Sequence, residues 1–152
     1  MNIKRIRKNI LERLEDWFCY DDEMIVKEEL VSILDTTISD KDYVAIVVEK
    51  ATDIIDKDNI FGKSAKEIYD FLLGLENTYG KGYLNEGWSG YESNYLEYCY
   101  KAEETEEEVT DRLYEVVKEK VEEYSKNKEE KIKRDKEIAD LELKLAALKR
   151  KS

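Results

Sequence analysis

The sequence predicts an all-α fold: a small multi-helix domain with a long C-terminal helix that extends as a short coiled-coil-like tail. Three observations support this prediction. Apolar residues recur three and four positions apart along most of the chain, which is the repeat of an amphipathic helix. Proline, which interrupts helices, is absent from the 152 residues. Two Ser/Thr-x-x-Glu capping boxes, Ser64–Glu67 and Thr105–Glu108, mark the starts of helices.

The N-terminal quarter predicts two helices separated by a polar break. Residues 3–18 place apolar side chains from Ile3 to Trp17 on one face, and lysines and arginines on the other. Tyr20 and the two aspartates after it interrupt this pattern. The second helix then continues the apolar repeat and is expected to end near Thr37.

Residues 39–55 predict a third helix. Ser39 with Asp42 three positions later is an N-cap pair. The β-branched run at residues 44–48 would by itself suit a strand. The apolar repeat from Tyr43 to Ile55 favours the helix.

Two shorter helices and a long loop are expected next. The fourth helix runs from the Ser64 cap to about Leu75. Five of the six glycines then fall between Gly74 and Gly90, which predicts a long irregular loop of the kind that often carries function. A short fifth helix is expected over residues 91–102.

The last helix opens at Thr105 and meets no stop signal before Arg150, so it would measure about 70 Å at ~1.5 Å per residue. Its apolar stripe is interrupted at residues 125–131. We therefore divide the chain into an acidic helical domain, residues 1–125, and a charged helical extension, residues 126–152. The stripe resumes in the extension with four residues that predict an oligomerisation surface: Ile138, Leu141, Leu145 and Leu148. This stripe is short for an isolated coiled coil, so the extension is expected to fray, pair with its own copy or dock on a partner.

Charge is distributed unevenly along the chain. Residues 19–125 carry 28 acidic against 11 basic side chains, whereas residues 1–18 and 126–152 have net charges of +2 and +4. A body with this field repels nucleic acid and membrane phosphates and attracts basic protein surfaces. We therefore expect no direct nucleic-acid or membrane contact, and a basic host protein as partner, in the cytoplasm of a bacterial host. No apolar stretch reaches the length of a membrane span.

The residue inventory argues against an enzyme. Histidine is absent, which removes the commonest general base and metal ligand. Gly62-Lys63-Ser64 ends like a P-loop, but Lys57 stands where its first glycine belongs. Pairs of carboxylates at helical spacing do not fall in the order that would hold Mg²⁺ across a cleft. No cofactor and no metal are expected.

Acidic residues on the second and third helices and around the start of the last one are candidate phosphate mimics. Residues 19–60 contain twelve acidic side chains and only four lysines. Ion pairs between neighbouring turns of a helix therefore cannot neutralise most of the acids. The alternative is a solvated face that keeps the protein soluble. The candidates are Asp21, Asp22, Glu28, Glu29, Asp42, Glu49, Asp53, Asp56, Glu104, Glu107 and Glu108.

Aromatic residues around the glycine-rich loop are candidate anchors for a protein partner. Tyrosine and tryptophan bury large areas at interfaces while keeping a polar atom. The candidates are Tyr83, Trp88, Tyr91 and Tyr95. For Tyr91 and Tyr95, the inner face of the fifth helix is the alternative role.

The motif Tyr20-Asp21-Asp22 opening a helix, and the Glu/Tyr-rich late helix ending in Val-Glu-Glu-Tyr124, resemble the Ocr-like anti-restriction DNA mimics of bacteriophages. The resemblance covers about residues 10–60 and 105–125. It implies a dimeric helical fold that occupies the DNA-binding groove of restriction enzymes. The basic C-terminal segment and the Gly/Trp loop depart from that family. Anti-CRISPR proteins share the same broad character.

Two functions follow from these observations. The first is a non-enzymatic acidic inhibitor, of phage or mobile-element type, that binds a cationic nucleic-acid-handling host enzyme or defence complex by DNA mimicry. The alternative is a helical structural or adaptor protein that self-associates, as a possible homodimer, through its C-terminal helix.

Overall fold

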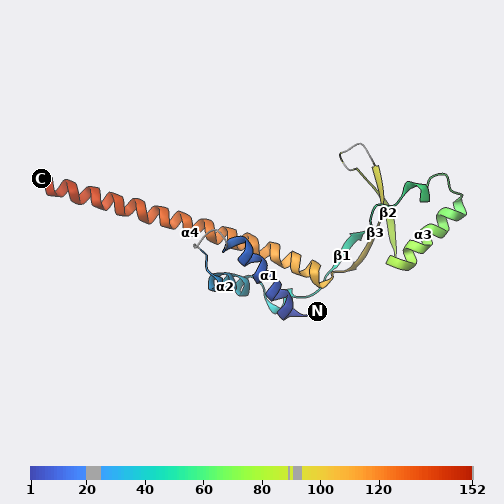
Figure 1. The fold of residues 1–152 in the computed structure, drawn as a ribbon, viewed down its shortest axis with the longest axis horizontal. Coiled ribbons are helices and arrows are strands. Elements are labelled where there is room, and N and C mark those ends of the chain that lie inside the picture. The colour runs from blue at the N-terminus through green and yellow to red at the C-terminus, as the bar shows by residue number, and fades with distance from the viewer. Residues whose placement is uncertain (20–24, 89, 91–93, 152) are drawn as a thin grey trace. The chain divides into compact units, whose positions relative to one another are not determined.

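A computed structural model describes residues 1–19, 25–88, 90 and 94–151. Within them the chain forms helices, short 3-10 turns and an antiparallel sheet (Figure 1). The expected all-α class is therefore wrong, and the fold is mixed. The elements in chain order are α1 (Ile3–Phe18), α2 (Lys27–Thr37), η1 (Asp40–Asp42), β1 (Val47–Ala51), η2 (Lys57–Asn59), α3 (Ala65–Tyr79), β2 (Gly82–Trp88), β3 (Asn94–Glu103) and α4 (Glu106–Lys151).

The helix expected at residues 39–55 is the first error. Ser39 and Asp42 do form a capping box, but it opens only the single 3-10 turn η1. The β-branched run then enters β1, in which Val47 lies opposite Glu103 and Ala51 opposite Cys99 of β3. Pairing with a strand that lies some 50 positions later outweighs the local helical repeat, because β-branched side chains suit a pleated surface.

The glycine-rich loop and the fifth helix are the second error. These segments form β2 and β3, which pair antiparallel and place β3 in the middle of the order β1-β3-β2. Two of the five glycines that suggest a loop lie inside β2. Gly82 lies opposite Tyr100 and Gly87 opposite Tyr95, and a Cβ at either glycine would collide with atoms of β3.

The chain divides into two compact units. Unit 1 comprises residues 1–44 and 106–152, and unit 2 comprises residues 45–105. The boundary expected at residue 125 falls inside α4.

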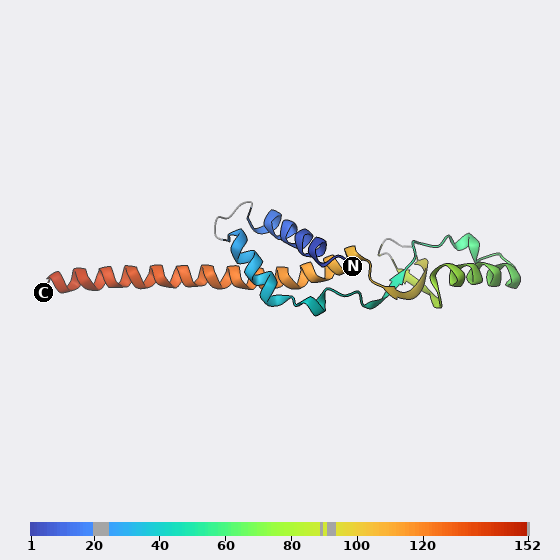
Figure 2. The same cartoon turned by 90° about the horizontal axis from the view of Figure 1, so that it is seen from below.

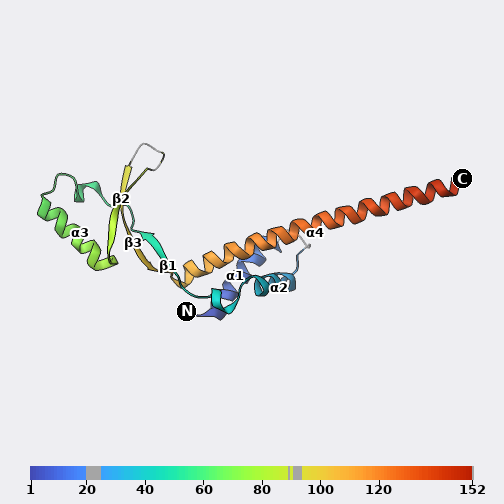
Figure 3. The same cartoon turned by 180° about the vertical axis from the view of Figure 1, so that it is seen from behind.

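Unit 1 is a helical bundle in which α1 and α2 lie along the N-terminal half of α4. The same arrangement is visible from two directions (Figure 2 and Figure 3). The expected first helix is confirmed as α1, with the Asn2 side chain accepting a hydrogen bond from the Arg5 N–H at its start. Trp17, expected on its apolar face, is instead 65% exposed beneath the Lys118 ammonium group. The fully buried side chains come from all three helices: Ile6, Ile10, Leu14, Leu30, Leu34, Val109, Leu113, Val117 and Val121.

The expected long C-terminal helix is also confirmed. The 46 residues of α4 form a helix of about 69 Å at ~1.5 Å per residue. Only its first half contributes to the core, and every residue from Glu129 to Lys151 is exposed. We call residues 129–151 the tail.

Unit 2 has a small apolar core. In its described part the buried apolar side chains are Ile55, Tyr98 and Cys99. The capping box at Ser64 and Glu67 opens α3 as expected, yet no residue of this fully described helix is buried. Tyr79, at the end of α3, packs its ring against those of Tyr98 and Tyr100.

Candidate functional site

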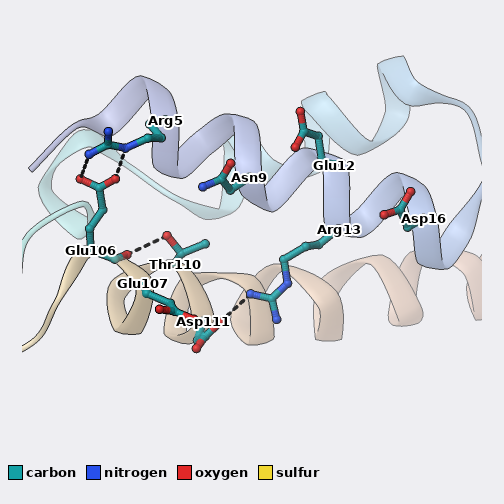
Figure 4. A pocket seen from close by; sticks show the side chains of 9 residues that line it. All are labelled: Arg5, Asn9, Glu12, Arg13, Asp16, Glu106, Glu107, Thr110 and Asp111. Carbon is teal, nitrogen blue, oxygen red and sulfur yellow. Dashed lines mark hydrogen bonds and ion pairs between the residues drawn. The ribbon is translucent and has the colours of Figure 1, made fainter.

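A groove of about 800 Å³ runs between α1 and α4 in unit 1 (Figure 4). Arg5 binds the Glu106 carboxylate through two nitrogens, and Arg13 reaches Asp111 at 2.6 Å. The Arg13 guanidinium also lies 3.9 Å from the centre of the Tyr114 ring. These contacts join the two helices across the groove.

Both arginines of the groove form ion pairs within it. The Arg5 hydrogen bonds, followed by one from the Asn2 N–H, lower the pKa of Glu106 to about 2. The Thr110 hydroxyl donates to the Glu106 carbonyl oxygen at 2.8 Å, so it is held by the helix itself. The groove therefore fastens α1 to α4, and its side chains are not arranged as a nucleophile beside a general base.

Of the described candidate phosphate mimics in unit 1, Glu29 forms an ion pair and Asp42 belongs to a capping box. Glu29 binds Lys128 at 3.0 Å, and Asp42 accepts two hydrogen bonds from Ser39 that lower its pKa. Glu28 is exposed in the first turn of α2. Glu107 lines the groove, and the next residue, Glu108, is half-buried. Asp21 and Asp22 lie outside the described residues.

Ion pairs elsewhere in unit 1 follow the same pattern. Arg7 binds Asp35 at 3.0 Å, Lys27 binds Glu15 at 3.3 Å, and Lys8 lies 3.7 Å from Glu12. Basic side chains of α1 and α2 are thus interleaved with the acids of the same surface, which weakens the negative potential there.

The remaining candidate acids belong to unit 2. Glu49 on β1 accepts a hydrogen bond from the Tyr83 hydroxyl at 2.9 Å, and Asp56 caps η2. Asp53 is exposed after β1. Glu104 is buried, and its carboxylate accepts a hydrogen bond from the Ile46 N–H, so it is not presented to a partner. The candidate acids therefore divide between the two units.

The described aromatic anchors, Tyr83, Trp88 and Tyr95, lie in strands and not in a loop or a helix. Trp88, the last residue of β2, is 70% exposed. Tyr83 is exposed on β2, and its bond to Glu49 raises its pKa to about 12. Tyr95 on β3 is half-buried, and its ring covers Gly87. Tyr91 lies outside the described residues.

The tail carries the most extensive exposed apolar surface in unit 1. The expected oligomerisation residues all lie in α4 and are all more than half exposed: Ile138, Leu141, Leu145 and Leu148. Sequence reasoning missed Leu143, which is 70% exposed and lies about 200° around the helix from Leu141. It also missed the hydrogen bond that joins Tyr83 on β2 to Glu49 on β1.

Among the residues that the structure describes, no group of three or more histidine, cysteine or acidic side chains is placed to hold a metal ion. None of the helices in the described ranges combines the length and the apolar character needed to cross a membrane.

No protein-family model, no curated protein and no solved structure matches this chain.

Proposed function

We propose that this protein is a non-enzymatic adaptor that self-associates through the tail of α4. One observation carries the proposal: the tail is exposed along its whole described length, yet it bears large apolar side chains at helical spacing. The stripe consists of Ile138, Leu141, Leu145 and Leu148.

A helix of this kind gains stability from being covered. Helices without tertiary contacts are marginal in water, because packing of the apolar face supplies most of their stability. Contiguous exposed apolar surface is typical of sites that bind another protein. The tail has both features, so a second helix laid along its stripe would bury the stripe and hold the tail in its helical form.

The energies favour a reversible association. Ile138, Leu141, Leu145 and Leu148 are 53–66% exposed. Covering four such side chains on each of two helices contributes on the order of 12 kcal/mol, at roughly 1.5 kcal/mol each. Association costs about 4–15 kcal/mol in lost motion. With a cost in the lower part of that range, about 4–8 kcal/mol, the remaining ~4–8 kcal/mol corresponds to a weak pair with Kd of roughly micromolar to millimolar.

The adaptor function fits the arrangement of charge better than a decoy does. A mimic of nucleic-acid phosphates needs carboxylates that are not neutralised by their neighbours. Glu29, Asp35, Glu106 and Asp111 each bind a basic side chain of the same unit. The acidic inhibitor of a basic host protein stays a prediction, and a complex that weakens steeply with added salt would support it.

Sedimentation equilibrium of the full chain over a wide concentration range tests the adaptor proposal. Wild type is expected to show a reversible oligomer. Leu141→Asp is expected to dissociate it, because Leu141 belongs to the stripe. Leu143→Asp is the matched control: it changes the same residue type two positions away, on the opposite side of the helix, and is expected to leave the oligomer intact.

Two outcomes would contradict the proposal. One is a wild-type protein that stays monomeric up to millimolar concentration. The other is an oligomer that persists undiminished in Leu141→Asp. Circular dichroism of both variants checks that unit 1 remains folded, which is expected since neither leucine contacts its core.

A further inference from the structure

We infer that two copies of this chain pair through their tails in an antiparallel orientation, with Leu143 level with the twofold axis. The inference rests on the proposed self-association and adds its geometry. It follows from the charges that flank the apolar stripe.

The stripe defines the positions of a heptad repeat, in which a and d face the partner and e and g flank them. Ile138 and Leu145 occupy a, and Leu141 and Leu148 occupy d. The charged residues at e are Asp135, Glu142 and Lys149, and those at g are Glu130, Glu137, Lys144 and Lys151. All of these side chains lie in α4 and are exposed, so they would flank a partner helix.

A parallel pair in register brings like charges together throughout. In that orientation each g residue meets the e residue five positions later on the other helix. Glu130 would meet Asp135, Glu137 would meet Glu142, and Lys144 would meet Lys149. Each contact occurs twice by symmetry, so six like-charge contacts oppose the parallel pair.

The positions that precede the stripe also oppose a parallel pair. Lys131 at a and Arg134 at d would each face its own copy across the seam, next to Ile138. Two basic side chains held against each other in an apolar seam lose hydration without gaining a partner.

An antiparallel pair removes most of these conflicts. Its layers join a to d, so Ile138 meets Leu148 of the other copy and Leu141 meets Leu145. Lys131 and Arg134 then no longer face their own copies across the seam. The four apolar layers lie next to one another, with no charged seam residue between them.

The flanking charges of an antiparallel pair are mostly complementary. In this orientation e residues face e residues, and g residues face g residues. Asp135 lies near Lys149 of the other copy and Glu137 near Lys151, which gives four opposite-charge contacts by symmetry. Glu142 and Lys144 each lie near their own copies, which gives two like-charge contacts. The balance favours the antiparallel pair over the parallel one.

The orientation sets the distance between the two helical bundles. Residue 121, the last buried position of α4, lies 22 residues before residue 143. Two such segments end to end span about 66 Å at ~1.5 Å per residue. The paired tails would therefore act as a spacer, with the bundle of α1, α2 and the N-terminal half of α4 from each copy at opposite ends.

Spin labels measure the orientation directly. A label at Glu129→Cys, with Cys19 and Cys99 replaced by alanine, is expected to give a distance of about 42 Å between copies along the axis. A label at Leu143→Cys in the same background is the matched control and is expected to give less than about 20 Å. A parallel pair would give less than about 20 Å at both positions and would overturn the inference.

Charge reversal provides a second readout on unlabelled protein. Lys149→Glu with Lys151→Glu is expected to weaken the pair about tenfold if it is antiparallel, because four attractions become repulsions. The same change tightens a parallel pair, since Lys144 then meets a glutamate. Mixing this variant with Asp135→Lys/Glu137→Lys restores the attractions and is expected to give a heterodimer tighter than either homodimer.

These outcomes separate the two proposals. A wild-type chain that remains monomeric overturns both. A dimer whose labels at residue 129 lie close together overturns the orientation alone and leaves the adaptor function standing.

Discussion

Replacing Gly82 with alanine is expected to destabilise unit 2 by about 3 kcal/mol. The new Cβ would overlap the Cys99 carbonyl oxygen and lie 2.8 Å from a ring carbon of Tyr98. A main-chain oxygen cannot rotate away, so the two strands must separate at this end of the β2–β3 pair. Such overpacking costs ~1–3 kcal/mol where side chains can adjust, and the upper figure applies where the backbone must move.

Two other glycines are controls for this experiment. At Gly87 the conflict is with the end of the Tyr95 ring, which can swing towards solvent, so alanine is expected to cost only about 1 kcal/mol. At Gly74, inside α3, a Cβ meets nothing within 4 Å. Alanine there is expected to stabilise the helix by about 0.5–1 kcal/mol.

Hydrogen exchange read by mass spectrometry measures these effects locally. A loss of about 3 kcal/mol should speed exchange in the β2 and β3 peptides of Gly82→Ala by roughly a hundredfold, since 1.4 kcal/mol corresponds to about tenfold. Peptides from α1 are the internal reference. Exchange in β2 and β3 within about threefold of wild type would refute the close approach of the two strands.

Three further expectations concern titrating groups. Because the Arg5 bonds lower the pKa of Glu106 to about 2, its contribution to stability is complete above its ordinary pKa of 4.5 and is lost as the pH falls towards 2. Urea unfolding should therefore separate wild type from Glu106→Gln at pH 7 but not near pH 2. The hydrogen bond to Glu49 raises the pKa of Tyr83 to about 12. The difference between the absorbance titrations of wild type and Tyr83→Phe should therefore have its midpoint near pH 12. Glu49→Gln should lower that midpoint. Burial, then nearby carboxylates, raise the pKa of Cys99, so its thiol should react with Ellman's reagent more slowly in the native than in the denatured protein.

The two units differ in how much of their apolar surface is covered. Unit 1 buries a continuous set of side chains from α1, α2 and α4, whereas α3 of unit 2 buries none. A folded segment with so few buried side chains has little stability of its own. We expect hydrogen exchange to be faster throughout unit 2 than in the core of unit 1, which the same experiment measures.

Sequence patterns anticipated the helices because helical order is local. The repeat of Ile6, Ile10 and Leu14 identifies α1, and the Ser64–Glu67 box identifies the start of α3. Each signal lies within a few residues of the structure that it specifies. The apolar repeat from Val109 to Tyr124 and the absence of proline likewise identify α4.

The sheet was missed because its evidence is not local. No local pattern around Val47 indicates that it pairs with Glu103. Gly87 by itself suggests a loop, and its place in a strand becomes evident only from its pairing with Tyr95. In the same way, the sequence shows a surplus of acids but not which of them have basic partners. Arg5 and Glu106 lie 101 positions apart and meet only when α1 packs on α4.

By itself the sequence predicted α1, α2, α3 and α4, the apolar stripe of the tail and the charges that flank it, since all of these follow from spacing along one helix. It also predicted helices over residues that form β1 and β3. Only the tertiary structure decided that residues 47–51, 82–88 and 94–103 form a sheet, and that many acids of unit 1 are neutralised by neighbouring bases. The physical reason is the same in both cases. Strand pairing and ion pairing join residues that are distant in the chain, and their energies exist only once the chain has folded.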